Sequence, residues 1–232
     1  MNRLITGLML FLASCALGQD ILVQKAQGDV SVRHGVAELW NRVAVGDILK
    51  TDDTMKTGKK GSALLVVKGG KRIVLPSEVI VDVSDIRNLS QEELMLKLTM
   101  EKVRASSYEW KSNEMNIPDI KTPHGPDRSP SKPLTENLLK VGKFEWNGTK
   151  VLYDNGYYST SALKAMEVLR RYPALGDTFE NRLLVAEALE KANLKSEALN
   201  EYANLKNSDK LTSEEREKVE SRISQLRKQS GR

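Results

Sequence analysis

The side chains that most often carry chemistry are few in this chain. It has two histidines, His34 and His124, and neither stands in a zinc-ligand pattern; Cys15 is the sole cysteine. The sequence shows neither a nucleophile elbow nor a phosphate-binding glycine loop. The carboxylate pairs Asp52-Asp53 and Glu92-Glu93 are neighbours in sequence, and a catalytic dyad needs converging side chains, whereas neighbours on a strand point apart. We interpret both pairs as solvated surface residues. The residues therefore predict no catalytic, metal or cofactor site, and we expect no enzymatic activity.

Cys15 lies in a segment with the pattern of a secretory signal peptide. Arg3 supplies a positive start, Leu4 to Ala13 form an apolar run, and small or short residues follow as far as Gly18. The apolar run is shorter than the roughly 20 residues that span a bilayer. We therefore expect residues 1–19 to be a signal peptide and the remaining chain to act outside the cytoplasm.

The same segment carries a second signal. Leu12-Ala13-Ser14-Cys15 resembles the bacterial lipobox, in which a peptidase cuts before a cysteine that carries lipid. The alternative is cleavage after Gly18, which would discard Cys15. Five residues separate Cys15 from the first expected strand at Ile21, which is a short linker for a lipid-anchored domain. Cys15 is thus a candidate for lipid modification, and both interpretations stay open.

Basic residues crowd two turns that we expect in the first part of the chain: Lys56, Lys59, Lys60, Lys68, Lys71 and Arg72. If these turns share one end of a domain, the six residues form a patch for an anionic surface such as lipid headgroups, lipopolysaccharide or acidic glycan. The alternative, which we favour, is that lysines at turns and edge strands keep a sheet soluble. The net charge of +5 is a small surplus spread over the chain and does not indicate a nucleic-acid partner.

The elements that would position these residues change character along the chain. Residues 20–87 hold short runs of β-branched and apolar residues, such as Ile21-Leu22-Val23 and Leu64-Leu65-Val66-Val67, separated by glycine-rich turns. The Lys68–Lys71 segment contains two glycines between two apolar runs and predicts a tight hairpin. We expect a small all-β domain over 20–87.

Helical spacing begins after residue 87. Ser90 and Glu93 form a capping-box pattern, and an amphipathic helix over 88–115 is expected to pack on the β-domain. Its apolar stripe would consist of Leu96, Met100, Val103, Ser107 and Trp110. Residues 116–134 contain five prolines, which predicts an extended linker.

Residues 135–232 have the pattern of a helical domain. Breaks are expected at 154–158 and at Asn193, and helix starts at Asp177 with Glu180 and at Thr212 with Glu215. Ala162-Leu163 and Ala198-Leu199 lie 36 residues apart, a period typical of helix-pair repeats. The whole predicts an α+β, multidomain protein.

The β-rich part resembles the FecR domain, the periplasmic module named after the regulator of iron-dicitrate uptake. The matching pieces, in order, are Gly28-Asp29-Val30, Gly46-Asp47-Ile48, Thr51, Thr57-Gly58, Gly61-Ser62-Ala63-Leu64, Gly69-Gly70 and Leu75-Pro76-Ser77. The hairpin departs from the family, which usually has Asp-Gly there. Family regulators also carry a cytoplasmic domain and a transmembrane helix before this module, so a direct sigma-factor role does not carry over. The resemblance implies a non-catalytic binding or scaffolding domain in the periplasm or outer-membrane-associated envelope of a Gram-negative-type bacterium.

The helical part is similar to tetratricopeptide repeats. Asp154-Asn155-Gly156-Tyr157-Tyr158, then Ala162-Leu163, then Pro173 match the turn, the second-helix alanine and the closing proline of such a repeat. A second copy is degenerate, with Asn193 in place of the glycine. The resemblance implies that protein partners bind along the helices. The alternative is a bundle of three or four helices that only packs.

Three functions follow from these expectations. The first is an envelope adaptor or scaffold that joins protein partners without chemistry. The second is an accessory component of envelope signalling or transport regulation that works through a separate transmembrane protein. The third and least favoured is an enzyme acting on peptidoglycan or glycan. We expect no nucleic-acid partner, and membrane contact only through a lipid on Cys15.

Overall fold

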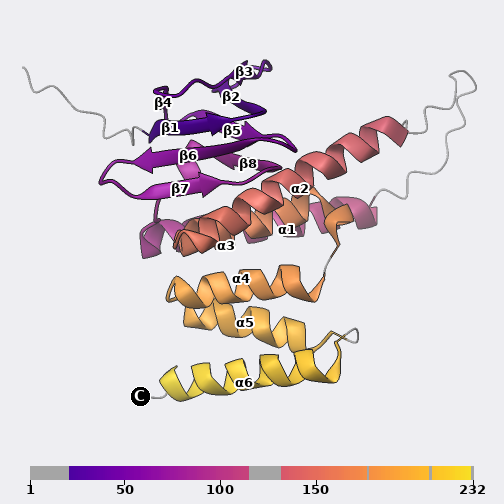
Figure 1. Ribbon diagram of the computed structural model, residues 1–232. Coiled ribbons are helices and arrows are strands. Elements are labelled where there is room, and N and C mark those ends of the chain that lie inside the picture. The colour runs from indigo at the N-terminus through magenta and orange to yellow at the C-terminus, as the bar shows by residue number, and fades with distance from the viewer. Residues whose placement is uncertain (1–20, 115–131, 177, 209–210, 231–232) are drawn as a thin grey trace, which may run out of the picture.

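The chain forms a β-sandwich and a stack of helices, which lie at opposite ends of the molecule (Figure 1). The computed structural model describes residues 21–114, 132–176, 178–208 and 211–230. The expected signal peptide, the candidate residue Cys15 and residues 116–131 of the expected linker lie outside the described residues. The α+β class expected from the sequence is confirmed.

The strands of the described residues make two four-stranded sheets, in which every pairing is antiparallel. The first sheet has the order β4-β1-β6-β7 and the second the order β3-β2-β5-β8. The strands are β1 (Ile21–Gln27), β2 (Val30–His34), β3 (Asn41–Arg42), β4 (Ile48–Leu49), β5 (Asp53–Thr57), β6 (Ser62–Val67), β7 (Arg72–Leu75) and β8 (Val79–Asp82), and the 3-10 turn η1 (Val83–Asp85) follows.

Alternation of apolar residues explains how the two sheets pack. In β7, Ile73 and Leu75 are buried in the core while Arg72 and Val74 are exposed, because successive side chains point to opposite faces. The expected hairpin after β6 is confirmed. Gly69 and Gly70 have φ values of 99° and 84°, which residues other than glycine rarely adopt. The sandwich core thus lies between the inner faces of the two sheets.

Helix α1 (Gln91–Glu114) begins at the expected cap, where the Glu93 N–H donates to Ser90 Oγ at 3.1 Å. The predicted buried stripe of this helix is wrong, because Leu96, Met100 and Val103 are 63%, 47% and 64% exposed. The side chains of Ser107 and Trp110 lie outside the described residues. The buried face instead carries Leu94, Leu98 and the carboxylate of Glu101, and its apolar residues join the helical core rather than the sandwich core.

Helix α2 (Lys132–Asp154) begins inside the expected linker. Residues 132–134 are therefore helical, which corrects the expected linker boundary at 134. Pro133 stands in the first turn of α2, where its missing N–H leaves no intrahelical hydrogen bond unmade.

Helix α2 lies along the edge strand β8 of the second sheet. A side chain at Gly148 would place its Cβ 1.9 Å from the carbonyl oxygen of Ile80, so the close approach requires glycine. Asn147 donates through Nδ2 to the carbonyl oxygen of Glu78 at 2.9 Å. The helix thereby covers an edge that would otherwise offer unpaired backbone groups.

The core of the sandwich also contains Val151, Leu152 and Tyr157, from the end of α2 and the turn that follows it. Helix α1, which precedes the expected linker, contributes Leu94 and Leu98 to the helical core. Packing therefore crosses the expected linker in both directions, and the sandwich and the helical stack are not two separately closed cores.

The remaining helices stack in chain order, each against the next (Figure 1). They are α3 (Tyr158–Arg171), the 3-10 turn η2 (Pro173–Leu175), α4 (Phe179–Lys191), α5 (Lys195–Lys206) and α6 (Ser213–Ser230). The expected breaks are confirmed, with Asn193 at a φ of 63° between α4 and α5. Ala162 and Ala198 are fully buried, as a close approach of paired helices requires.

Caps define the helix starts. The Thr212–Glu215 capping box is confirmed, because the Thr212 N–H donates to Glu215 Oε2 at 2.8 Å. Helix α4 begins differently from expectation: Thr178 is its cap and accepts the Asn181 N–H, while Asp177 lies outside the described residues. Within the described ranges, no helix is both long and apolar enough to cross a membrane.

Candidate functional site

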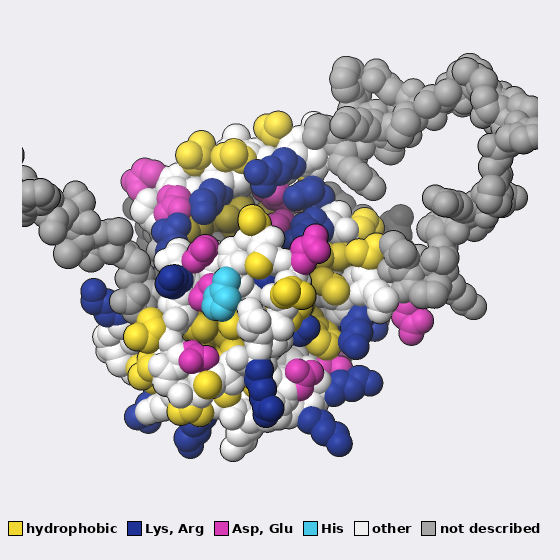
Figure 2. All heavy atoms as spheres, turned by 90° about the horizontal axis from the view of Figure 1, so that it is seen from above, with side chains coloured by type: hydrophobic (Ala, Val, Ile, Leu, Met, Phe, Trp, Pro, Cys, Tyr) yellow, Lys and Arg dark blue, Asp and Glu magenta, His cyan; other side chains and the backbone are white. Residues whose placement is uncertain are grey.

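The six basic residues of the candidate patch for an anionic surface are divided by strand β6. Lys59 and Lys60 lie in the turn before β6, whereas Lys68 and Lys71 lie in the hairpin after it. A strand of six residues separates its two ends by roughly 20 Å. Figure 2 shows basic side chains dispersed over the face seen from above, with acidic side chains among them. The structure therefore does not bring the six residues to one end of the sandwich.

Two of the six basic residues, Lys56 and Lys71, contact aromatic rings. The Lys56 amine lies 4.3 Å from the centroid of the Trp40 ring. The Lys71 amine lies 3.9 Å from the centroid of the Tyr157 ring and donates to the carbonyl oxygen of Asn155. Arg72 is exposed on β7. Lys71 is thus engaged in contact between the sandwich and the helices.

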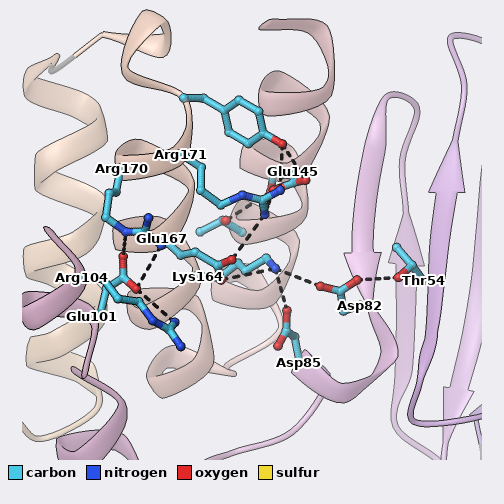
Figure 3. A network of polar contacts seen from close by, with 12 residues as sticks. Thr54, Asp82, Asp85, Glu101, Arg104, Glu145, Lys164, Glu167, Arg170 and Arg171 are labelled. Carbon is cyan, nitrogen blue, oxygen red and sulfur yellow. Dashed lines mark hydrogen bonds and ion pairs between the residues drawn. The ribbon is translucent and has the colours of Figure 1, made fainter. Parts of the chain in front are cut away.

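A group of charges lies between the sandwich and α3, around Lys164 (Figure 3). Its Nζ is 2.9 Å from Asp82 Oδ2 on β8, 3.5 Å from Asp85 Oδ2 in η1 and 3.6 Å from Glu167 Oε2 on α3. The Lys164 side chain is 13% exposed. Thr54 on β5 donates its hydroxyl to Asp82 Oδ1 at 2.7 Å, which extends the group into the second sheet.

The two aspartates that share Lys164 have pKa values shifted in opposite directions. Burial acts to raise the pKa of Asp82, but the charge of Lys164 and the hydrogen bonds from Thr54 and Lys164 outweigh it and hold the pKa below its usual value. At Asp85 burial dominates and raises the pKa to about 6, with the negative charges of Asp82 and Glu167 adding to the effect. Burial acts to lower the pKa of Lys164, but the surrounding carboxylates outweigh it and raise that pKa.

Two further ion pairs extend the network along α3 (Figure 3). Arg170 donates to the buried carboxylate of Glu101 on α1, and Arg104 lies 3.7 Å from the same group. Arg171 donates to Glu145 on α2 at 3.0 Å. Helix α3 is therefore tied to α1, α2, β8 and η1 by charged groups.

The charged groups of this network are engaged with one another across several elements. The raised pKa keeps Lys164 protonated, so its amine has no lone pair for nucleophilic attack. The carboxylate of Asp82 already accepts hydrogen bonds from Lys164 and Thr54. We interpret the Lys164 network as a clamp between the sandwich and the helical stack.

The sequence analysis did not predict the burial of Asp53. Asp53, expected on a solvated surface, is 2% exposed and contacts His34 Nδ1 at 2.7 Å. It also accepts the Lys50 N–H at 2.8 Å. The register of β2 against β5 places His34 directly opposite Asp53, and this long-range pairing leaves no local signal in the sequence. Of the other expected surface pair, Glu93 is paired with Arg87 and Lys97, and Glu92 is exposed.

A cavity of about 620 Å³ opens at one edge of the helical stack. It lies where the segment before α4, the end of α5 and the segment before α6 meet, and it is lined by apolar and polar side chains, among them Phe179, Arg182, Asn204, Leu205 and Leu211. Phe179, Leu205 and Leu211 supply apolar surface, and most of the other lining side chains are polar or charged. This cavity is the candidate binding site.

The described residues contain no group of three or more histidine, cysteine, aspartate or glutamate side chains placed to hold a metal ion. Comparison with protein families, characterised proteins and solved structures finds no match for this chain. The functional argument therefore rests on the geometry of the chain itself.

Proposed function

We propose that this chain is a non-catalytic, exported protein of the bacterial envelope that acts as an adaptor, with a protein partner bound at the edge of its helical stack. The observation that carries the proposal is the cavity of about 620 Å³ formed jointly by α4, α5 and the segment before α6. Stacked helices offer partners a surface built from several elements, as helical-repeat proteins do.

The connection between the two parts supports a scaffolding role. The clamp around Lys164 and the insertion of Val151, Leu152 and Tyr157 into the sandwich core hold the sandwich and the stack in one arrangement. A partner bound to the stack would then be held at a defined position relative to the sandwich. The antiparallel sandwich and the consecutive helix hairpins support the proposed FecR-like and tetratricopeptide-like assignments.

Cross-linking capture with matched variants tests the partner site. Asn204 is exposed on α5 and lines the cavity, whereas Asn200 is exposed on the same helix outside the lining. We expect Asn204→Trp to fill the cavity and abolish the specific cross-linked partner band in the envelope fraction, while Asn200→Trp retains it. Thermal melts of both variants should match the unsubstituted chain. Equal capture by both variants would place the partner elsewhere.

Mass spectrometry of the native N-terminus tests export. We expect a chain that begins at Cys15 with attached lipid, or near Gln19 without lipid, because of the Arg3, Leu4–Ala13 and small-residue pattern. An unprocessed Met1 terminus in the cytosolic fraction would refute the envelope assignment.

A further inference from the structure

Apolar side chains cover part of the outer face of the first sheet. Five of them point away from the core and lie across all four strands: Ile48 on β4, Leu22 on β1, Leu64 and Val66 on β6, and Val74 on β7. Ile48, Val74 and Leu22 are 63%, 61% and 42% exposed. We call these five residues the outer apolar face.

The strand register makes the outer apolar face continuous. Leu22 lies directly opposite both Ile48 and Val66, and Leu64 lies opposite Val74. The inner side chains of the same strands already complete the sandwich core. Single exposed apolar residues are ordinary, but adjacent ones across a sheet mark an interaction surface.

Positive charges surround the outer apolar face. Lys25 lies opposite Leu64 and Arg72 lies opposite Val66 in the register. Lys50 follows β4 and Lys68 follows β6, and all four basic side chains are exposed. The nearby carboxylate of Asp47 accepts the Ala44 N–H at 2.8 Å and keeps its negative charge, so the four basic residues outnumber it. An apolar centre with a cationic rim matches the interface of a membrane that contains anionic lipid.

The position of Cys15 in the sequence selects the same surface. β1 begins at Ile21, which pairs with Leu49 and Val67 at the end of the sheet where Lys50 and Lys68 follow. The five residues between Cys15 and Ile21 can extend to at most about 20 Å. A lipid on Cys15 would therefore hold this end of the first sheet close to the bilayer.

We propose that the outer apolar face lies against the membrane surface, with anionic phospholipid headgroups contacting its basic rim. The proposal rests on the proposed export of the chain and adds a second contact to the lipid, since a lipid together with a basic surface anchors more firmly than the lipid alone. A second copy of the protein fits less well, because a two-fold contact would bring Lys25, Arg72 and their counterparts into mutual proximity.

The test uses the full chain, processed by a Gram-negative host, purified from its membranes and reconstituted into vesicles of phosphatidylethanolamine and phosphatidylglycerol. An environment-sensitive fluorophore is attached to Val74→Cys on the outer apolar face or to Val36→Cys, an equally small and fully exposed residue after β2. The unsubstituted chain, labelled in the same way, gives the background from Cys15. Lipids that carry a quencher at the headgroup report proximity to the bilayer.

We expect lipid quenching of the label at position 74 and not at position 36. The quenching should be lost in vesicles of phosphatidylcholine alone and in the Lys25→Glu, Arg72→Glu double variant, whose exposed substitutions leave the melting temperature unchanged. Equal quenching at the two positions, failure of the chain to associate with the vesicles, or disulfide-linked dimers of the unlabelled Val74→Cys chain would each overturn the proposal. Partner capture at the helical cavity is read independently with Asn204→Trp, so the two proposals fail separately.

Discussion

Replacing Lys164 with methionine removes the amine that three carboxylates share between the sandwich and the helical stack. Methionine has a similar length and fits the same space, so the change isolates the charge. Asp82 retains its hydrogen bond from Thr54, but Asp85 loses the cation that lies 3.5 Å away. We expect the free energy of unfolding of the whole chain to fall.

The magnitude follows from burial. Removing one partner of a buried ion pair typically costs about 3–5 kcal/mol, because the other charge stays buried. The side chains of Lys164, Asp85 and Asp82 are 13%, 22% and 33% exposed, so solvent screens the site in part. We therefore expect a loss of about 3 kcal/mol near neutral pH.

The loss should depend on pH with a definite sign. Without Lys164, the pKa values of Asp82 and Asp85 rise above those in the unsubstituted chain, where the pKa of Asp82 is lowered and that of Asp85 is about 6. A carboxyl with a raised pKa in the folded state favours folding at low pH, and that contribution disappears as the pH rises through the folded-state pKa. The deficit of Lys164→Met should thus be greatest above about pH 7 and shrink toward about pH 5.

Urea unfolding followed by circular dichroism at about pH 8 and about pH 5 measures both effects. Lys206→Met is the matched control, because Lys206 pairs with Glu220 at 3.0 Å but both side chains are nearly half exposed. Exposed pairs contribute about 0–1 kcal/mol, so this variant should change little. Equal losses in the two variants, or a Lys164→Met deficit that is the same at both pH values, would refute the clamp.

Three further predictions concern single positions. Asp85→Asn removes a carboxylate whose pKa is raised to about 6. The difference in urea midpoint between this variant and the unsubstituted chain should therefore favour the variant more at about pH 8 than at about pH 5. The reverse order would contradict the assigned shift. Gly148→Ala should lower the melting temperature because its Cβ would lie 1.9 Å from the carbonyl oxygen of Ile80, although alanine favours a helix by about 1 kcal/mol; a higher melting temperature would refute the close approach. Ala162→Phe should overpack a fully buried site by about 1–3 kcal/mol and lower the melting temperature by several degrees, whereas Lys195→Glu at the start of α5 should leave it unchanged.

Features set by neighbours in the chain were predictable from the sequence. The caps at Ser90 and Thr212, the glycine hairpin at 69–70 and the break at Asn193 all depend on interactions within a few residues. Their side chains and backbone angles act locally, so the pattern of residue types was sufficient.

Choices between equivalent local patterns were not predictable. Two stripes run along α1, and the expected one, through Leu96 and Met100, is exposed because α3 packs on the other. The buried stripe includes the charged residue Glu101, so its composition did not indicate a buried face. Glu101 is buried because Arg170 and Arg104 lie beside it. Asp53 was likewise assigned to the surface because the pairing of β2 with β5 is a long-range contact.

By itself the sequence determined the order of the β-rich and helical parts, the turns and the caps, because residue types and short spacings specify local backbone geometry. The tertiary structure decided how the parts join: α2 along the edge strand β8, Tyr157 in the sandwich core, and Lys164 beside Asp82 and Asp85, which are far from it in sequence. It also separated the basic turns to opposite ends of β6 and gathered the outer apolar face from four strands. These features depend on which distant segments pack together, because burial and ion pairs between such segments form only in the folded chain.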